Sequence, residues 1–113
     1  MPFTQCNLKE LEDIGAVFGG APGIEFHAAT KALELEHSAL SHQSVPPGAR
    51  FPFGHTHHTQ EEVDVVVRGS VRVPPGTWRG FEAGREGLEI LVAGAPNLGD
   101  DPRGDVDGER DWW

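Results

Sequence analysis

The sequence predicts an all-β fold, a small two-sheet sandwich or barrel. Short runs of mainly β-branched or aliphatic residues at positions 63–67 and 88–92 are typical of strands. Turns rich in proline and glycine separate the apolar segments, as in "VPPG" at 45–48 and "PPG" at 74–76. A chain of 113 residues with 37% hydrophobic content supports one compact core. We therefore expect one β domain with little helix.

The first 23 residues are predicted to form an N-terminal extension with one short helix. Asn7 is a candidate N-cap, and Glu10 stands three residues after it. Leucine and isoleucine side chains follow at helical spacing, but Gly15 and the "GGAPG" segment at 19–23 end this pattern early. We expect at most two helical turns.

The first strand region is predicted from a period-two pattern between residues 24 and 45. Leu33, Leu35, His37 and Ala39 fall on one face of an extended chain, and glutamate and serine residues alternate with them. The later strands are predicted at 63–67, 71–76 and 88–92.

Residues 1–96 are predicted to form the domain, and residues 97–113 an acidic C-terminal tail. The tail, "NLGDDPRGDVDGERDWW", is polar and rich in glycine and aspartate, so we expect little regular structure in it. Its last two residues, Trp112 and Trp113, are the exception, because burying each would stabilise a fold by roughly 1.5–3 kcal/mol or more. We expect the tail to dock on the domain or on a second subunit.

The charge balance argues against nucleic acids and anionic membranes as partners. The chain carries 18 acidic and 9 basic side chains, a formal net charge of -9, which repels phosphate groups. A single cysteine, Cys6, allows no internal disulfide, and no basic cluster in the sequence activates its thiol. The opening "MPFTQCNLKELED" lacks signal-peptide features, and no apolar run reaches the roughly 18 residues of a membrane helix. We expect a cytoplasmic protein.

Three of the six histidines stand together in "GHTHHTQEE" at 54–62, directly before a strand segment. Alternate side chains of a strand point the same way, so His55 and His57 share one face, and His58 is expected to be solvated. If a turn at 58–61 reverses the chain, Glu62 joins them. Two imidazoles and one carboxylate suit Zn, Mn, Fe, Ni or Cu better than Ca or Mg. The alternative interpretation is a group of solvated histidines beside a turn.

The spacing of this unit resembles the first motif of the cupin superfamily. In that motif a glycine precedes an HxH pair, a glutamate follows after three or four residues, and a glycine follows six residues later. Here the corresponding positions are Gly48, His55, His57, Glu62 and Gly69, with one extra residue between Gly48 and His55. The choice of Glu62 over its neighbour follows from the six-residue spacing to Gly69.

The second cupin motif is partly retained, so the resemblance covers about residues 33–96. Pro74 and Gly76 stand at its PxG positions, but Arg79 replaces its histidine and Ala83 its asparagine. The resemblance implies a small jelly-roll barrel in which three histidines and one glutamate bind a metal. Only three of these four ligand positions carry over.

Arg79 cannot serve as the fourth ligand, because its guanidinium keeps its proton and offers no lone pair. We expect it to point away from a metal or to take the place of one. Asp64 has the same strand parity as Glu62, so it is expected either to supply a further oxygen or to hold Arg79 in an ion pair. Trp78 and Phe81 flank this arginine and are interpreted as core or interface residues rather than substrate-stacking ones.

The short connection between the two motifs predicts a truncated barrel. Cupins usually carry a β-hairpin here, whereas only "SVRV" joins Gly69 to Pro74, so about fifteen to twenty residues are missing. A sheet that lacks a hairpin has an exposed edge, which the tail or a second copy of the chain would cover. We therefore expect a homodimer.

The resemblance implies a function that involves a divalent transition metal, with Zn, Mn, Fe and Ni as the candidates, and a small oxygenated metabolite that bears a carboxylate. As an enzyme the protein would be a metal-dependent oxygenase or isomerase. Arg79 is then the candidate catalytic residue, which clamps the substrate carboxylate or stabilises an enolate oxyanion. The alternative is a non-catalytic ligand-binding or regulatory cupin, with or without a metal. The missing histidine favours this alternative.

Overall fold

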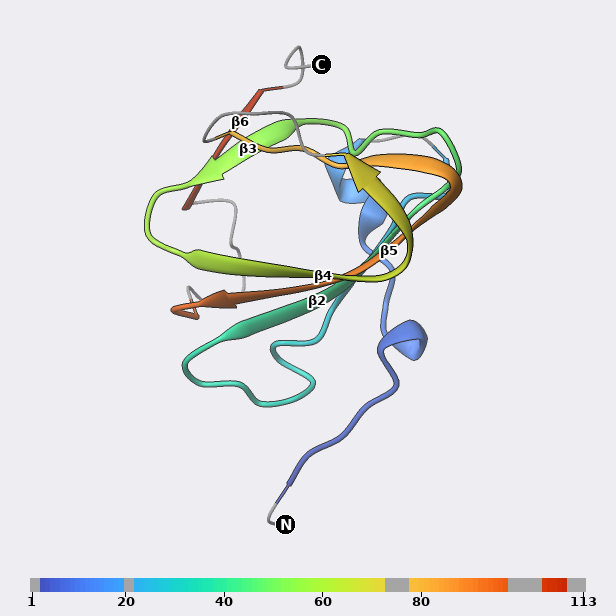
Figure 1. Cartoon of the computed structure of the whole chain (residues 1–113). Coiled ribbons are helices and arrows are strands. Elements are labelled where there is room, and N and C mark those ends of the chain that lie inside the picture. The colour runs from blue at the N-terminus through green and yellow to red at the C-terminus, as the bar shows by residue number, and fades with distance from the viewer. Residues whose placement is uncertain (1–2, 20–21, 73–77, 98–104, 110–113) are drawn as a thin grey trace.

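The structure, a computed structural model, describes residues 3–19, 22–72, 78–97 and 105–109, and it confirms an all-β fold (Figure 1). The helical segments among these residues are two short 3-10 turns, η1 (Leu8–Glu10) and η2 (Gly15–Phe18). The strands are β1 (Glu25–Ala28), β2 (Ala39–Val45), β3 (Gly54–His57), β4 (Glu61–Arg72), β5 (Glu82–Ala95) and β6 (Val106–Glu109).

The strands form two antiparallel sheets. The larger sheet has the order β1-β2-β5-β4, and the smaller sheet pairs β3 with β6. Two isolated backbone bridges connect the sheets. Arg79, just before β5, bridges to His55 on β3, and Glu82, the first residue of β5, bridges to Arg50. Figure 1 shows β3 and β6 on one side of the domain and β4, β5 and β2 on the other. The jelly-roll type stays a prediction.

The predicted strand around residues 33–39 is wrong for most of its length. Residues 30–37 form turns and bends, and regular pairing begins only at Ala39, the first residue of β2. The N–H of Leu33 donates to the carbonyl of Ala29, and Glu34 has a left-handed φ of 55°. These local bonds satisfy the backbone without a ladder, so alternating leucine and glutamate side chains do not make a strand here.

The strands predicted at 63–67 and 88–92 are confirmed, but each belongs to a longer strand. β4 and β5 pair over most of their length, with register shifts between Val66 and Arg68 and between Gly69 and Val71. Gly69 has a φ of 85°, and a Cβ there would collide with the backbone carbonyl of Gly87. A glycine is therefore required at this bulge. Of the strand predicted at 71–76, Val71 and Arg72 end β4 and the rest lies outside the described residues.

The first part of the N-terminal extension, around η1, lies against the outer face of the larger sheet, whereas Phe18 of η2 packs against the core. The prediction of Asn7 as a cap is confirmed, because its side chain accepts a hydrogen bond from the N–H of Lys9. Lys9 in turn forms an ion pair with Glu89 on β5, with 2.8 Å between Nζ and Oε1. A carbonyl at Leu11 lies 2.9 Å from Nδ1 of the buried His27 on β1. The extension is therefore tied to the sheet by polar contacts.

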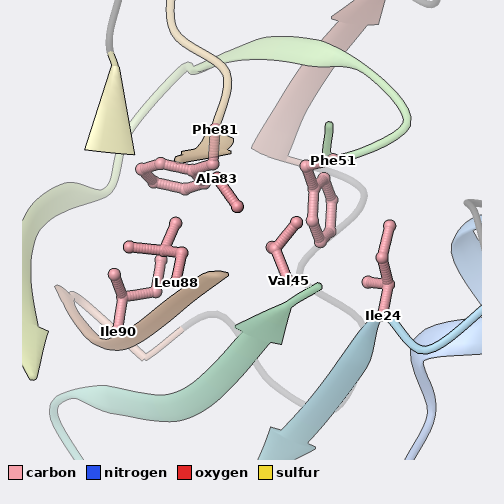
Figure 2. Packing of buried hydrophobic residues seen from close by; sticks show 7 residues of the cluster. All are labelled: Ile24, Val45, Phe51, Phe81, Ala83, Leu88 and Ile90. Atoms are coloured by element: carbon pink, nitrogen blue, oxygen red, sulfur yellow. The ribbon is translucent and has the colours of Figure 1, made fainter. Parts of the chain in front are cut away.

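The core lies between the two sheets, as the side chains in Figure 2 show. Its buried members are Ile24, Val45, Phe51, Phe81, Ala83, Leu88 and Ile90. Ile90 on β5 is 0% exposed and lies beside Leu88 (Figure 2). The prediction that Phe81 is a core residue is confirmed, since only 4% of it is exposed. Trp78 is half-buried.

The prediction that the tail has little regular structure is wrong for β6. Val106 to Glu109 form a strand that pairs with β3, with His55 opposite Gly108 and His57 opposite Val106. The tail therefore does dock on the domain. Trp112 and Trp113 lie outside the described residues, and so do Pro74 and Gly76 of the second motif.

The outer face of β4 carries exposed apolar side chains. Val63, Val65 and Val67 are 51–58% exposed. β4 is also an edge strand of the larger sheet among the described residues. The homodimer stays a prediction, and these valines are surface that a second copy would cover. Within the described part of the chain, no helix is long and apolar enough to cross a membrane.

Candidate metal site

The register of the larger sheet brings Glu62 to the inner face. Glu62 on β4 pairs with Gly94 on β5. The pairs Asp64–Val92 and Val66–Ile90 follow at intervals of two residues, so all three pairs share one face of the sheet. Ile90 is fully buried in the core, so alternate residues of β4 point toward the smaller sheet. The predicted common face of Glu62 and Asp64 is thus present.

The two histidines approach Glu62 from the opposite sheet. His55, His57 and Glu62 each offer one ligand atom, and these atoms all lie within 4.8 Å of one another. Ligand atoms on a tetrahedral zinc ion are about 3.4 Å apart, so small side-chain rotations would bring the three onto one ion. These three residues form a group that could hold a metal ion. His58 is exposed, as predicted, and contacts Asp107 at 2.8 Å.

Both oxygens of Glu62 are engaged in the structure. Oε2 lies 2.8 Å from Nε2 of His57. Oε1 accepts from the guanidinium of Arg79, at 3.2 Å from Nη2 and 3.3 Å from Nε. Arg79 is held there by paired backbone hydrogen bonds with His55, of 2.7 and 3.0 Å. Arg79 therefore forms its ion pair with Glu62, whereas strand parity had suggested Asp64 as a partner.

Asp105 is a site residue that the sequence analysis missed. Its Oδ2 lies 3.3 Å from Nδ1 of His57, on the side of the ring opposite Glu62. Asp105 is 8% exposed, and its oxygens accept hydrogen bonds from the backbone N–H groups of Thr59 and Gln60. It comes from the segment before β6, about fifty residues from His57 in sequence. No short-range signal in the acidic tail indicates this contact.

The site favours neutral histidines. Burial, followed by the positive charges of Arg79 and His57, lowers the pKa of His55 to about 4. Burial and the charge of Arg79 also lower the pKa of His57, although Asp105 acts against this shift. Neutral imidazoles have the free lone pair that metal binding requires. Nδ1 of His55 is buried and has no hydrogen-bond partner among the described residues, and Nδ1 of His57 is close to Asp105 at 3.3 Å without the geometry of a hydrogen bond.

Asp64 lies beside the trio but is not part of it. The residue as a whole is exposed, but its carboxyl group is partly removed from water. This desolvation, and then the negative charge of Glu62, raise the pKa of Asp64 to about 7. The group of converging ligand atoms consists of His55, His57 and Glu62 and does not include Asp64. The predicted role of Asp64 as a further ligand is less well supported than the trio.

A cavity of about 640 Å³ lies between the sheets and reaches the trio. Its lining includes His55, His57 and Glu62, together with five phenylalanine side chains. Those phenylalanines are Phe18, Phe26, Phe51, Phe53 and Phe81. Arg79 is not among the lining residues, but it contacts Glu62, which is one of them.

Comparison with known proteins adds no relative. A scan of the chain against models of protein families finds no match, and a search of curated proteins finds no similar sequence. The interpretation of this site therefore depends on its own geometry and on the motif spacing.

The pKa differences among the histidines predict a specific order of titration. In an NMR titration of the imidazole nitrogens, His55 is expected to stay neutral to a pH of about 4. His58 is expected to titrate above its ordinary value, because its contact with Asp107 raises its pKa. Since His55 binds its proton more weakly in the folded chain than in the unfolded chain, its contribution to stability falls as pH drops from about 6.5 to about 4.

The variant Asp107→Asn is the control for this titration. It is expected to return His58 toward its ordinary pKa of about 6.5 and to leave His55 unchanged. A His55 resonance that titrates near 6.5 in the wild type would contradict the buried site. Individual resonances are needed, because the raised pKa of Asp64 affects overall stability in the opposite sense.

Proposed function

We propose that the chain is a small cupin-like protein that binds one divalent transition metal ion through His55, His57 and Glu62. The motif spacing, the converging ligand atoms and the cavity that reaches them support this proposal. The ligand set leaves coordination positions open, as in catalytic metal sites. A bound ion would polarise an oxygen atom of a small molecule in the cavity.

The environment of His57 carries the proposal. One ring nitrogen lies 2.8 Å from Glu62 and the other lies 3.3 Å from Asp105, so two carboxylates flank the imidazole. A neutral imidazole has one N–H and can donate to only one of them. The other carboxylate then faces a nitrogen lone pair, unless the imidazole takes up a second proton or a cation lies between the two. A metal between His57 and Glu62, with the N–H directed at Asp105, satisfies all these groups.

Arg79 is proposed to position Glu62 rather than to bind substrate. Its guanidinium contacts one carboxylate oxygen, which leaves the oxygen next to His57 for a metal. The substrate clamp expected from the resemblance stays a prediction, and Arg79 is not among the residues that line the cavity. If the protein is an enzyme, its class would be that of the metal-dependent oxygenases or isomerases.

A metal-free ligand-binding or regulatory module is the second candidate. The observation that favours it is that both oxygens of Glu62 already have partners in His57 and Arg79. In this alternative the guanidinium supplies the positive charge that a metal would bring. The two candidates differ in one measurable property, the affinity for a metal ion.

Calorimetric titration of zinc into protein purified without a histidine tag tests the proposal. We expect one ion per chain, bound with micromolar or tighter affinity at pH 7.5, together with proton release if any ligand is still protonated. The same titration with manganese, nickel and ferrous iron ranks the candidate ions. Absence of binding at hundreds of micromolar metal would refute the metal site and leave the metal-free module.

The variant Arg79→Gln is expected to bind zinc at least about tenfold more tightly than the wild type. A unit positive charge roughly 5 Å from a divalent ion raises the free energy of the bound ion by about 2 kcal/mol even in water. The increase is larger in a partly buried site. Arg79 is 22% exposed, so the water value is a lower bound. The control is Arg50→Gln, which removes an ion pair to Glu82 and should leave the zinc affinity unchanged. Weaker zinc binding by Arg79→Gln would show that positioning of Glu62 outweighs charge repulsion.

A further inference from the structure

The cavity between the sheets has an aromatic wall that leads to the proposed metal site. Phe26 and Phe18 lie 5.0 Å apart between ring centroids, and Phe18 lies 6.1 Å from Phe53. Phe53 meets His55 edge-on at 6.0 Å, and His55 meets His57 at 5.2 Å. These spacings are typical of interacting aromatic rings. The wall thus runs without a gap from β1 to the ligand histidines.

The size and polarity of the cavity restrict what it can bind. A volume of about 640 Å³ is in the range of small-molecule sites. Besides the histidines, Lys31 is the only cationic side chain in its lining among the described residues, and it is exposed. The lining also includes the polar residues Thr30, Ser41, Gln43 and Gln60, but a sugar or a polyanion would still leave polar groups without partners against five phenylalanine rings. The lining therefore favours an apolar, ring-shaped body.

The charge of the site restricts the polar end of the ligand. A divalent ion held by the trio would keep a net charge of +1, because Glu62 is the one anionic ligand among the three and the ligand imidazoles are neutral. One carboxylate on the ligand neutralises this excess, whereas two would reverse it in a partly buried place. A single carboxylate oxygen is also a suitable ligand for an open position on a transition metal.

We propose that the cavity binds small aromatic monocarboxylates, with the ring against the phenylalanine wall and the carboxylate directed at His55, His57 and Glu62. This inference rests on the proposed function for the metal that receives the carboxylate. The aromatic wall itself is independent of any metal.

Metal-free protein tests the aromatic wall alone. In saturation-transfer NMR, benzyl alcohol is expected to bind more tightly than cyclohexylmethanol, by about two- to tenfold, because ring–ring contacts add to simple burial. The double variant Phe18→Leu/Phe53→Leu should lose this preference, and the exposed Phe3→Leu should keep it. Should the double variant fail to fold, Phe53→Leu alone serves the same purpose. An unchanged preference in the folded variant, or no preference in the wild type, would overturn the inference.

Zinc-loaded protein tests the complete ligand. Benzoate is expected to bind several-fold more tightly than cyclohexanecarboxylate and far more tightly than acetate, measured by calorimetry after the zinc affinity is known. If zinc does not bind while benzyl alcohol shows its preference, the metal proposal fails and the aromatic wall stands. If zinc binds and benzoate binds no more tightly than acetate, the assignment of aromatic monocarboxylates is overturned.

Discussion

The double variant His55→Ala/His57→Ala is expected to lose measurable zinc binding, a decrease of at least about a thousandfold in affinity. Two of the three protein ligands disappear, and Glu62 then remains paired with Arg79 alone. A single carboxylate beside a guanidinium does not hold a transition metal. The measurement is calorimetric titration at pH 7.5, with far-UV circular dichroism as the check that the variant is folded.

The matched control is His37→Ala/His58→Ala, which removes the same number of imidazoles from exposed positions. His37 is 96% exposed and His58 is 51% exposed at the side chain. Zinc binding by this control should equal that of the wild type. Equal binding by both double variants would identify the histidine cluster as solvated surface.

The variant Ile90→Ala is expected to lower the free energy of unfolding by about 2–5 kcal/mol. Ile90 is fully buried among Val45, Leu88 and the phenylalanines of the core, so its truncation leaves a cavity that the two sheets cannot close. Urea unfolding measures the change. Val17→Ala, at a residue that is 59% exposed, should change the stability by no more than about 0.5 kcal/mol. A loss below 1 kcal/mol for Ile90→Ala would place the core elsewhere.

The central part of the site could be predicted from the sequence because it depends on local periodicity. In a strand, His55 and His57 must share a face, and one turn brings the chain back to Glu62. The fold class was predictable for a similar reason, since the valines of β4 and the apolar residues of β5 form clear strand runs.

The rest of the site depends on contacts between distant segments. Asp105 reaches His57 only because β6 pairs with β3, and a four-residue strand with one β-branched side chain gives almost no signal of its own. The partner of Arg79 was missed for a related reason. Parity places both Glu62 and Asp64 on one face, and only the backbone bridge to His55 selects Glu62.

The failure at residues 33–39 has a different cause. Alternation of Leu33 and Leu35 with glutamates fits a strand, but it equally fits a turn in which some side chains pack inward. The hydrogen bonds that close this turn are from backbone to backbone, between Ala29 and Leu33 and between Thr30 and Leu35. Side-chain patterns carry no information about such bonds, so the sequence could not distinguish the two structures.

X-ray absorption at the zinc edge, on protein loaded with one equivalent of zinc, tests the central claim most directly. The account predicts two imidazole nitrogens at about 2.0–2.1 Å, recognised by multiple scattering, and oxygen ligands at about 2.0–2.2 Å from Glu62 and solvent or a small ligand. In His55→Ala/His57→Ala the imidazole signal should disappear. A sulfur shell near 2.3 Å, which would indicate Cys6, or a shell of oxygen alone would contradict the His55–His57–Glu62 site.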